Sequence, residues 1–129
     1  MISLEGLENI TSVGRFYMSD SNLLSSLTGL HNLEQVNGPF IFSGNDGLSD
    51  FTGLESLVDI SGFFNLIFNE TITSFNGLGN LQSIGDFFWI KNNTAITSLA
   101  GLNSLTNIGG EFLLENALAC HREQHKKPE

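Results

Sequence analysis

The chain has 129 residues, of which 40% are hydrophobic, and its 14 acidic and 5 basic side chains give a formal net charge of −9. This length and hydrophobic content suit one folded domain and argue against a disordered chain. Such acidity argues against nucleic acids and anionic membranes as partners, because phosphate binding depends on clustered Lys and Arg. The single cysteine, Cys120, excludes an internal disulfide, and no apolar run is long enough to insert into a membrane.

The chain begins without the basic and apolar segments of a signal peptide. Residues 3–7, Ser-Leu-Glu-Gly-Leu, are similar to residues 98–102, Ser-Leu-Ala-Gly-Leu, from its interior. The start therefore matches the middle of a repeat, and we expect the chain to be a fragment of a longer protein.

A Gly-Leu pair recurs along the chain at a regular spacing, and only the first interval is one position shorter than the others. A fixed period of this kind indicates a stacked array of repeats. It predicts five coils of about 24 residues, the first of which aligns with the others only through a one-residue deletion near Arg15. The pairs are Gly6-Leu7, Gly29-Leu30, Gly53-Leu54, Gly77-Leu78 and Gly101-Leu102.

Each coil continues with apolar residues three apart and a glycine-bearing turn, after which the period changes to two. That alternation is typical of a half-buried β-strand. A polar turn with Asn45, Asn69 and Asn93 in register follows, and an apolar pair closes the coil. The inward strand columns are Phe16, Phe40, Phe64, Phe88 and Phe112, and Met18, Phe42, Leu66, Ile90 and Leu114.

One coil cannot bury its own apolar residues, whereas stacked coils place like residues on like and form a continuous core. We therefore predict an all-β solenoid, a parallel β-helix whose strands repeat at roughly 4.8 Å. The pattern fails after Leu114. The predicted solenoid occupies residues 1–118, and residues 119–129 form a polar C-terminal tail or cap.

Written as G-L-x-x-[LI]-x-x-[VI]-x-G-x-x-F-x-[FIL], followed by N and [LI]-[ST]-x-[LF], the coil resembles the receptor L-domain family. The resemblance covers residues 3 to about 118. It implies a right-handed, leucine-rich-repeat-like solenoid of a cell-surface or extracellular protein, whose sheet face contributes to ligand contact. The chain departs from leucine-rich repeats because two residues separate Asn93 from Ile96, and it lacks the cysteine-bearing caps of receptor modules.

Strand alternation turns a second set of side chains away from the core. Most of them are apolar, whereas a solvated sheet face carries polar side chains, and an exposed patch with Trp, Tyr and Phe is typical of an interface. The alternative is that another segment of the complete protein, or a second copy, covers this face. The predicted partner-binding residues are Tyr17, Ile41, Phe63, Ile67, Phe87 and Trp89.

Two polar clusters are candidates for metal sites, and we expect a metal at neither. The tail residues Cys120, His121, Glu123 and His125 include zinc-ligand types, but H-x-E-x-H differs from the metalloprotease H-E-x-x-H. We therefore expect the tail from His121 to be dispensable for folding. Asn45-Asp46-Gly47 with Asp50 lacks the acidic spacing of a calcium loop and is typical of a turn.

Three N-x-T sequons begin at Asn9, Asn69 and Asn92, a number that the abundance of Asn, Ser and Thr yields by chance. His31 has no acid or nucleophile placed around it by the repeat. A column of Ser25, Ser49, Thr73 and Thr97 beside Ser26, Asp50, Ser74 and Ser98 raises ice binding as a possibility. These are adjacent residues at a corner, which favours a role in turns. A thermal-hysteresis measurement would discriminate between ice binding and a role in turns.

The sequence contains no phosphate-binding glycine loop and no nucleophile elbow, and its repeated columns of Leu, Ile and Phe cannot transfer protons. We expect no catalytic residues and no cofactor. The leading hypothesis is a non-enzymatic recognition module that binds a protein or glycan ligand, or associates with itself. The alternative is a structural spacer or adhesin segment whose sheet face packs on a neighbouring domain or protomer, and ice binding is a third possibility.

Overall fold

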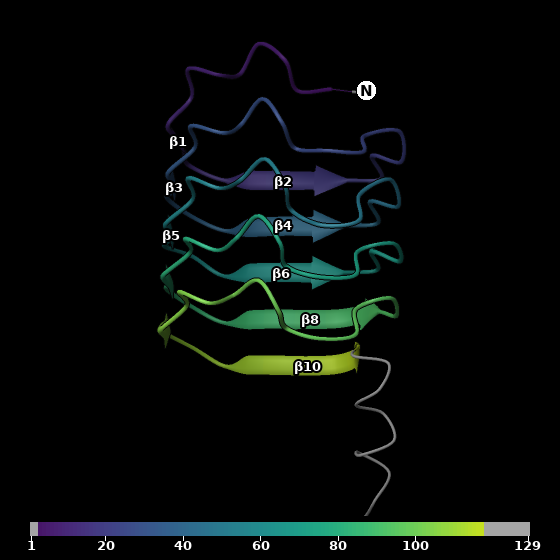
Figure 1. Cartoon of the computed structure of the whole chain (residues 1–129). Helices are drawn as coiled ribbons and strands as arrows, with labels where there is room; N and C mark the ends of the chain where they lie inside the picture. Colours follow the sequence, from purple (N-terminus) through teal and green to yellow (C-terminus); the bar gives the residue numbers. More distant parts are fainter. Residues whose placement is uncertain (1–2, 118–129) are drawn as a thin grey trace, which may run out of the picture.

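The structure is a computed structural model that describes residues 3–117. These residues form ten strands, which are arranged in two parallel five-stranded sheets. They contain no helix, and so no helix that could cross a membrane. Figure 1 shows the strands stacked one below another, so the chain winds through about four turns of a β-solenoid. The predicted all-β fold of stacked parallel strands is confirmed.

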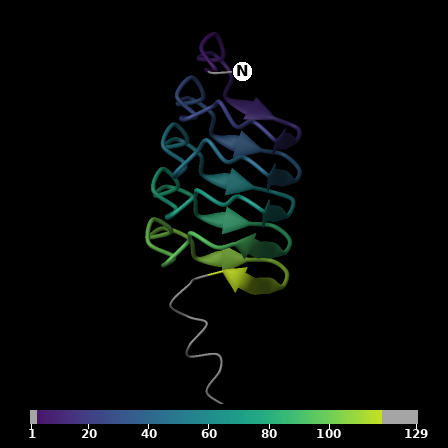
Figure 2. The same ribbon diagram turned by 90° about the vertical axis from the view of Figure 1, so that its right-hand side faces the viewer.

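The two sheets differ in strand length and meet at a corner, as the side view shows (Figure 2). The long-strand sheet has the order β10-β8-β6-β4-β2, and its strands are β2 (Phe16–Ser19), β4 (Phe40–Ser43), β6 (Phe64–Ile67), β8 (Phe88–Asn93) and β10 (Phe112–Ala117). The short-strand sheet has the order β1-β3-β5-β7-β9, and its strands are β1 (Ser12–Val13), β3 (Gln35–Val36), β5 (Asp59–Ile60), β7 (Ser83–Ile84) and β9 (Asn107–Ile108).

Strand pairing places each residue beside its counterpart in the next repeat. Phe40 pairs with Phe64, and Phe64 pairs with Phe88. Val13 pairs with Val36 and Phe16 pairs with Phe40, so the sequence separation between partners is one position shorter for the valines. The one-residue deletion of the first repeat therefore lies between Val13 and Phe16, where the sequence alignment located it.

Consecutive tight turns explain the three-residue spacing of the leucines. The Leu30 N–H donates to the Leu27 carbonyl at 3.1 Å, and the Leu33 N–H donates to the Leu30 carbonyl at 3.0 Å. Bonds between residues three apart bring every third side chain to the same side, here the interior. The Gly-Leu glycines adopt positive φ, and a Cβ on Gly53 (φ 115°) would lie only 2.6 Å from the Thr28 nitrogen. Glycine is therefore required where neighbouring repeats come closest.

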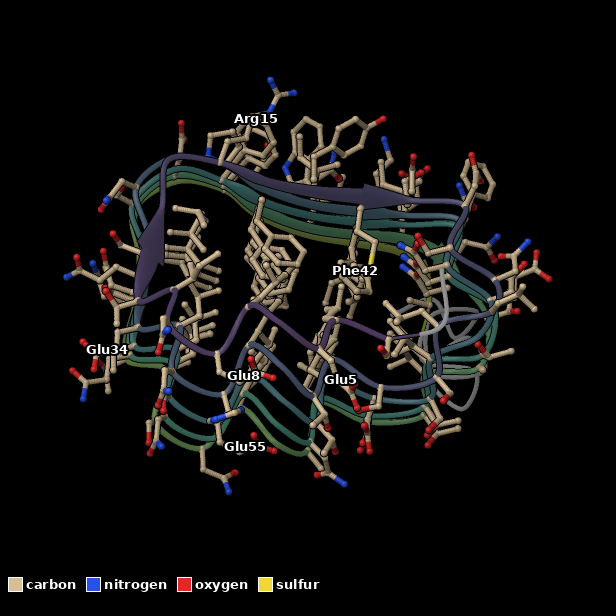
Figure 3. The ribbon with its side chains drawn as sticks, turned by 90° about the horizontal axis from the view of Figure 1, so that it is seen from above. Glu5, Glu8, Arg15, Glu34, Phe42 and Glu55 are labelled. Atoms are coloured by element: carbon tan, nitrogen blue, oxygen red, sulfur yellow. The ribbon has the colours of Figure 1, made fainter. Side chains whose placement is uncertain are left out.

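The core consists of apolar columns that run along the solenoid axis (Figure 3). Phe40, Phe64 and Phe88 are fully buried, and ring centroids in this column are 4.8 and 4.7 Å apart. Phe51 and Phe75, from the closing pairs, contact the column edge-on at 6.2 Å. The predicted inward orientation of the phenylalanine column is therefore confirmed for the inner strands.

The only buried polar side chains among residues 3–117 form a ladder of asparagines. The Asn45 N–H donates to Asn69 Oδ1 at 2.9 Å, and the Asn69 N–H donates to Asn93 Oδ1 at 2.8 Å. Each side-chain amide also donates to a carbonyl of the preceding repeat, as Asn69 Nδ2 does to Phe42 at 2.9 Å. The ladder satisfies the backbone at the corner where the chain leaves the long strands.

Candidate binding face on the long-strand sheet

Alternation along the long strands separates an inner from an outer set of side chains. In β4 and β6 fully buried residues alternate with partly exposed ones. Figure 3 shows Phe42 directed into the interior and Arg15 directed away from it, with several aromatic rings on the outer side. We call this outer side the outward face, and its residues are Arg15, Tyr17, Pro39, Ile41, Phe63, Asn65, Ile67, Phe87, Trp89, Lys91, Glu111, Leu113 and Glu115.

All six predicted binding residues lie on the outward face, but they are not equally accessible. Tyr17, on the edge strand β2, is 61% exposed, whereas the other five are half-buried. For Phe63, Phe87 and Trp89 the half-burial arises because their rings stack on one another. The face is therefore a preformed apolar surface rather than a set of isolated exposed residues.

Three aromatic side chains form a stacked cluster at its centre. The rings of Phe63 and Phe87 are 4.4 Å apart and nearly parallel, and those of Phe87 and Trp89 are 4.0 Å apart. Lys91 Nζ lies 5.2 Å from the Trp89 ring centroid, within the range of a cation–π contact. Trp89 and Lys91 lie in β8, and Phe63 and Phe87 directly precede β6 and β8, so the sheet fixes the geometry of the cluster.

Two polar atoms within this apolar surface lack a hydrogen-bond partner. They are Asn65 Oδ1 and Trp89 Nε1, both buried at the atom level by their neighbours. Their residues are direct register partners on β6 and β8. An unsatisfied buried polar group costs about 1–3 kcal/mol, so the packing of Asn65 and Trp89 lowers the stability of this part of the sheet.

The outward face carries both cations of the described residues, together with Glu111 and Glu115 at β10. Arg15 and Lys91 are the Lys and Arg residues between positions 3 and 117, and both lie on this face. The Arg15 guanidinium carbon is 5.6 Å from the Tyr17 ring centroid. Glu5, Glu8 and Glu55 lie on the opposite side of the solenoid (Figure 3). Within the described residues, the face is therefore the one region of this acidic body where cations are interleaved with aromatic rings.

Phe68 is a candidate contact residue that the repeat pattern did not reveal. It directly follows β6, is 54% exposed and has φ 58°. The equivalent positions, also at positive φ, are Asp20, Gly44, Asn92 and Asn116. A bulky residue is rare in this region, so an exposed phenylalanine there is a functional candidate. The one sequence signal is that Phe68 stands at a position where the other repeats have Asp, Gly or Asn.

The other polar candidates serve as turn residues. Asn45 belongs to the ladder, Asp46 Oδ1 accepts the Glu70 N–H at 3.1 Å, and Asp50 Oδ1 accepts the Thr52 N–H at 3.0 Å. His31 is exposed. Between residues 3 and 117 no three His, Cys, Asp or Glu side chains are grouped so as to hold a metal ion. The tail residues Cys120, His121, Glu123 and His125 lie outside the described residues.

The sequons and the Ser/Thr column also have defined surroundings. Asn69 is fully buried in the ladder, which excludes glycosylation there in the folded chain, whereas Asn9 is exposed and Asn92 half-buried. Ser25, Ser49, Thr73 and Thr97 are exposed, and Thr73 Oγ1 donates to the Ser49 carbonyl at 3.3 Å. Part of this column therefore bonds the backbone of adjacent repeats.

Comparison of the chain with protein-family models, with curated proteins and with solved structures gives no match.

Proposed function

We propose that the chain is a non-enzymatic recognition module that binds a protein or glycan ligand through the outward face. The observation that carries this proposal is the Phe63–Phe87–Trp89 cluster, in which three large rings are stacked on a rigid sheet and remain partly open to water. Aromatic residues of this kind dominate binding energy because they bury large areas at low entropic cost. The sheet holds them in place before a ligand arrives, which lowers the cost of binding.

The polar features of the face describe the ligand that would fit. Arg15 and Lys91 favour a ligand with anionic groups beside its apolar surface, and the acidic remainder of the chain would repel such a ligand elsewhere. Arg15 is exposed and Lys91 is partly exposed, so both can donate hydrogen bonds to oxygen atoms of a ligand. Protein and glycan ligands both carry such oxygen atoms.

The test begins with a screen of the purified chain against a glycan array and a panel of secreted proteins. Ligands found there are then titrated against Phe63→Asp/Trp89→Asp. We expect at least a hundredfold loss of affinity, about 2.7 kcal/mol, because hot-spot residues cost about 2 kcal/mol or more when truncated. Trp89→Phe, which keeps a ring but reduces its contact area, should lose roughly tenfold.

A matched control adds the same charge elsewhere. Gln35→Asp/Gln82→Asp places two carboxylates at exposed positions on or beside the short-strand sheet and should leave affinity unchanged. Tyr17→Asp, at the exposed edge of the face, provides a variant that does not disturb the stacked cluster. Unchanged affinity in both Phe63→Asp/Trp89→Asp and Tyr17→Asp would refute binding through this face.

A structural role is the second candidate, supported by the half-burial of Ile41, Phe63, Ile67, Phe87 and Trp89. In this case the chain is a spacer or adhesin segment, and the outward face packs on a neighbouring domain or protomer. The screen separates the two roles. A spacer should bind no ligand in the screen. In a longer protein that contains this segment, Phe63→Asp/Trp89→Asp should still disturb the packing of the outward face on its neighbour.

The finer assignment of the fold belongs with this proposal. We infer a right-handed solenoid of five coils of about 24 residues, similar to leucine-rich repeats and to the receptor L-domain, in a cell-surface or extracellular protein. The regular period of the coil motif supports the number of coils, and the handedness and the localisation are what its resemblance to the receptor L-domain implies. An experimental structure that showed left-handed winding would contradict the assignment.

A further inference from the structure

The outward face carries opposite charges at two positions that a twofold rotation would interchange. Arg15 and Glu111 directly precede β2 and β10 at equivalent register positions, and both side chains are exposed. In the order β10-β8-β6-β4-β2, β6 lies midway between those two strands. Within residues 3–117 neither side chain has an ion-pair partner. Each charge is therefore available to a group of opposite charge on another molecule.

The apolar side chains of the face suit the same rotation. When two copies pack face to face about an axis along β6, positions on β4 come opposite the equivalent positions on β8. Pro39 then faces Phe87 of the second copy, and Ile41 faces its Trp89. In both pairs a smaller side chain meets a larger one, which allows the two sheet faces to interdigitate. Phe63, beside the axis, meets Phe63 of the second copy.

The shape and size of the face allow such packing but limit its strength. Seen along the solenoid axis, the long strands lie nearly over one another, so the sheet is close to flat (Figure 3). Five strands about 4.8 Å apart, with residues spaced about 3.3 Å, give roughly 24 Å by 16 Å, or about 400 Å² of sheet. Each partner of a standard interface buries about 800 Å². We therefore expect a weak dimer, with a dissociation constant on the order of 100 µM.

Charge distinguishes this packing from the other twofold packing of the same face. An axis along the solenoid would place Glu111 opposite Glu115 of the second copy, because these carboxylates lie at opposite edges of the face on one repeat. That contact would occur twice and would be repulsive. The axis along β6 instead places Glu111 opposite Arg15, also twice, and Glu115 opposite Ser19. The charges therefore favour solenoids that run antiparallel.

We propose that the ligand of the outward face is a second copy of this chain, packed face to face with its solenoid axis antiparallel. This inference rests on the proposed function, because it names the partner of the same face. Glu111 of each copy supplies the anionic group that Arg15 of the other favours. The axis is set by the positions of Arg15 and Glu111 relative to β6. A twofold contact uses the same surface on both chains, so assembly stops at a dimer.

The test is sedimentation velocity of the full chain between about 10 µM and about 1 mM, a range that brackets the expected dissociation constant. A reductant keeps Cys120 from cross-linking two chains. We expect monomers and dimers without larger species. Glu111→Arg and Arg15→Glu should each raise the dissociation constant about tenfold, because each reversal makes two ion pairs repulsive. Combined in one chain, the two reversals should restore the wild-type value.

Two matched variants add the same charge as Glu111→Arg at other positions. Glu34→Arg lies away from the outward face and should not weaken the dimer (Figure 3). Glu115→Arg should give the same dissociation constant as Glu34→Arg, because Glu115 faces Ser19 of the second copy. A clearly tighter dimer with Glu115→Arg would show that Glu111 faces Glu115, and the proposed packing would be wrong.

Three other results would overturn the proposal: a chain that stays monomeric throughout, species larger than a dimer, or a double reversal that does not restore association. Phe63→Asp/Trp89→Asp should abolish the dimer, and a dimer that persists in this variant uses another surface. The proposed function is tested separately. A monomeric chain that still binds a ligand from the screen, and loses it in Phe63→Asp/Trp89→Asp, would refute the second copy as partner and support the face as a binding site.

Discussion

Individual side chains of this solenoid have roles that their residue types alone do not disclose. Asn69 accepts the backbone N–H of Asn45 and donates to the carbonyls of Phe42 and Ile67. The sequence shows asparagines in register, which predicts a polar turn, but it does not show that they are buried and bonded to one another. Burial follows from the corner geometry, which appears only when the repeats are stacked.

Replacing Asn69 should therefore damage the fold although it lies outside the apolar core. Asn69→Ala leaves buried backbone groups on two repeats without partners, each costing about 1–3 kcal/mol. We expect chemical denaturation to show a loss of at least about 2 kcal/mol. Asn76→Ala, at an exposed position, is the control and should change stability by under about 0.5 kcal/mol. Equal losses in the two variants would contradict the ladder's role.

Glu8 provides a pH-dependent local contact. Hydrogen bonds from its own backbone N–H and from the Gly6 N–H lower the pKa of its carboxyl, and His31 adds a smaller favourable charge. A lowered folded-state pKa contributes stability above the unfolded-state value, and that contribution is lost as pH falls through the folded value. An NMR titration should place the Glu8 pKa below its ordinary value. The stability difference between wild type and Glu8→Gln should disappear at acidic pH, and a constant difference would contradict this.

Phe68 combines a strained backbone with an exposed ring. Asparagine adopts positive φ more readily, so Phe68→Asn should stabilise the chain by about 0.5–1 kcal/mol. If the ring contacts a ligand, the same variant should bind that ligand more weakly. Thermal unfolding and a titration of one ligand would measure both effects. A variant that is less stable than wild type would contradict the strain argument.

At the scale of the strands, alternation predicted the long-strand sheet correctly and missed the other sheet. The columns of Phe and of Met, Phe, Leu and Ile recur once in every repeat, and the structure pairs them in that register. The short strands, such as β5 and β7, contain two residues each, so they have no alternation to detect. Tight turns precede them, and the three-residue period of those turns masks the strands that follow.

Position along the stack should control the cost of losing a phenylalanine. Phe64 is fully buried between its neighbours, so Phe64→Ala should cost roughly 3–5 kcal/mol. Phe112 occupies the same column at the exposed end, so Phe112→Ala should cost only about 1 kcal/mol. Urea denaturation of both variants measures the difference. Similar costs at the two positions would mean that the column is not stacked as described.

At the scale of the whole molecule, the solenoid presents two contrasting lateral surfaces: an acidic side and the outward face. The sequence predicted all six face residues on one side because strand alternation leaves no other arrangement. It did not predict their half-burial, since the stacking of Phe63, Phe87 and Trp89 depends on side-chain contacts between repeats. The sequence also could not indicate the ligand, because the repeated apolar residues are needed for packing the core and carry no information about what the face binds.

The division between core and outward face depends on adjacent residues pointing in opposite directions. Phe63 and Phe64 are the same residue type at consecutive positions, one half-buried on the face and the other fully buried. The decisive measurement is the free energy of unfolding of Phe63→Asp compared with Phe64→Asp. We predict a loss of about 1–2 kcal/mol for Phe63→Asp, from the broken ring stacking, and at least about 5 kcal/mol or failure to fold for Phe64→Asp. Equal losses, or a larger loss at Phe63, would contradict a free outward face.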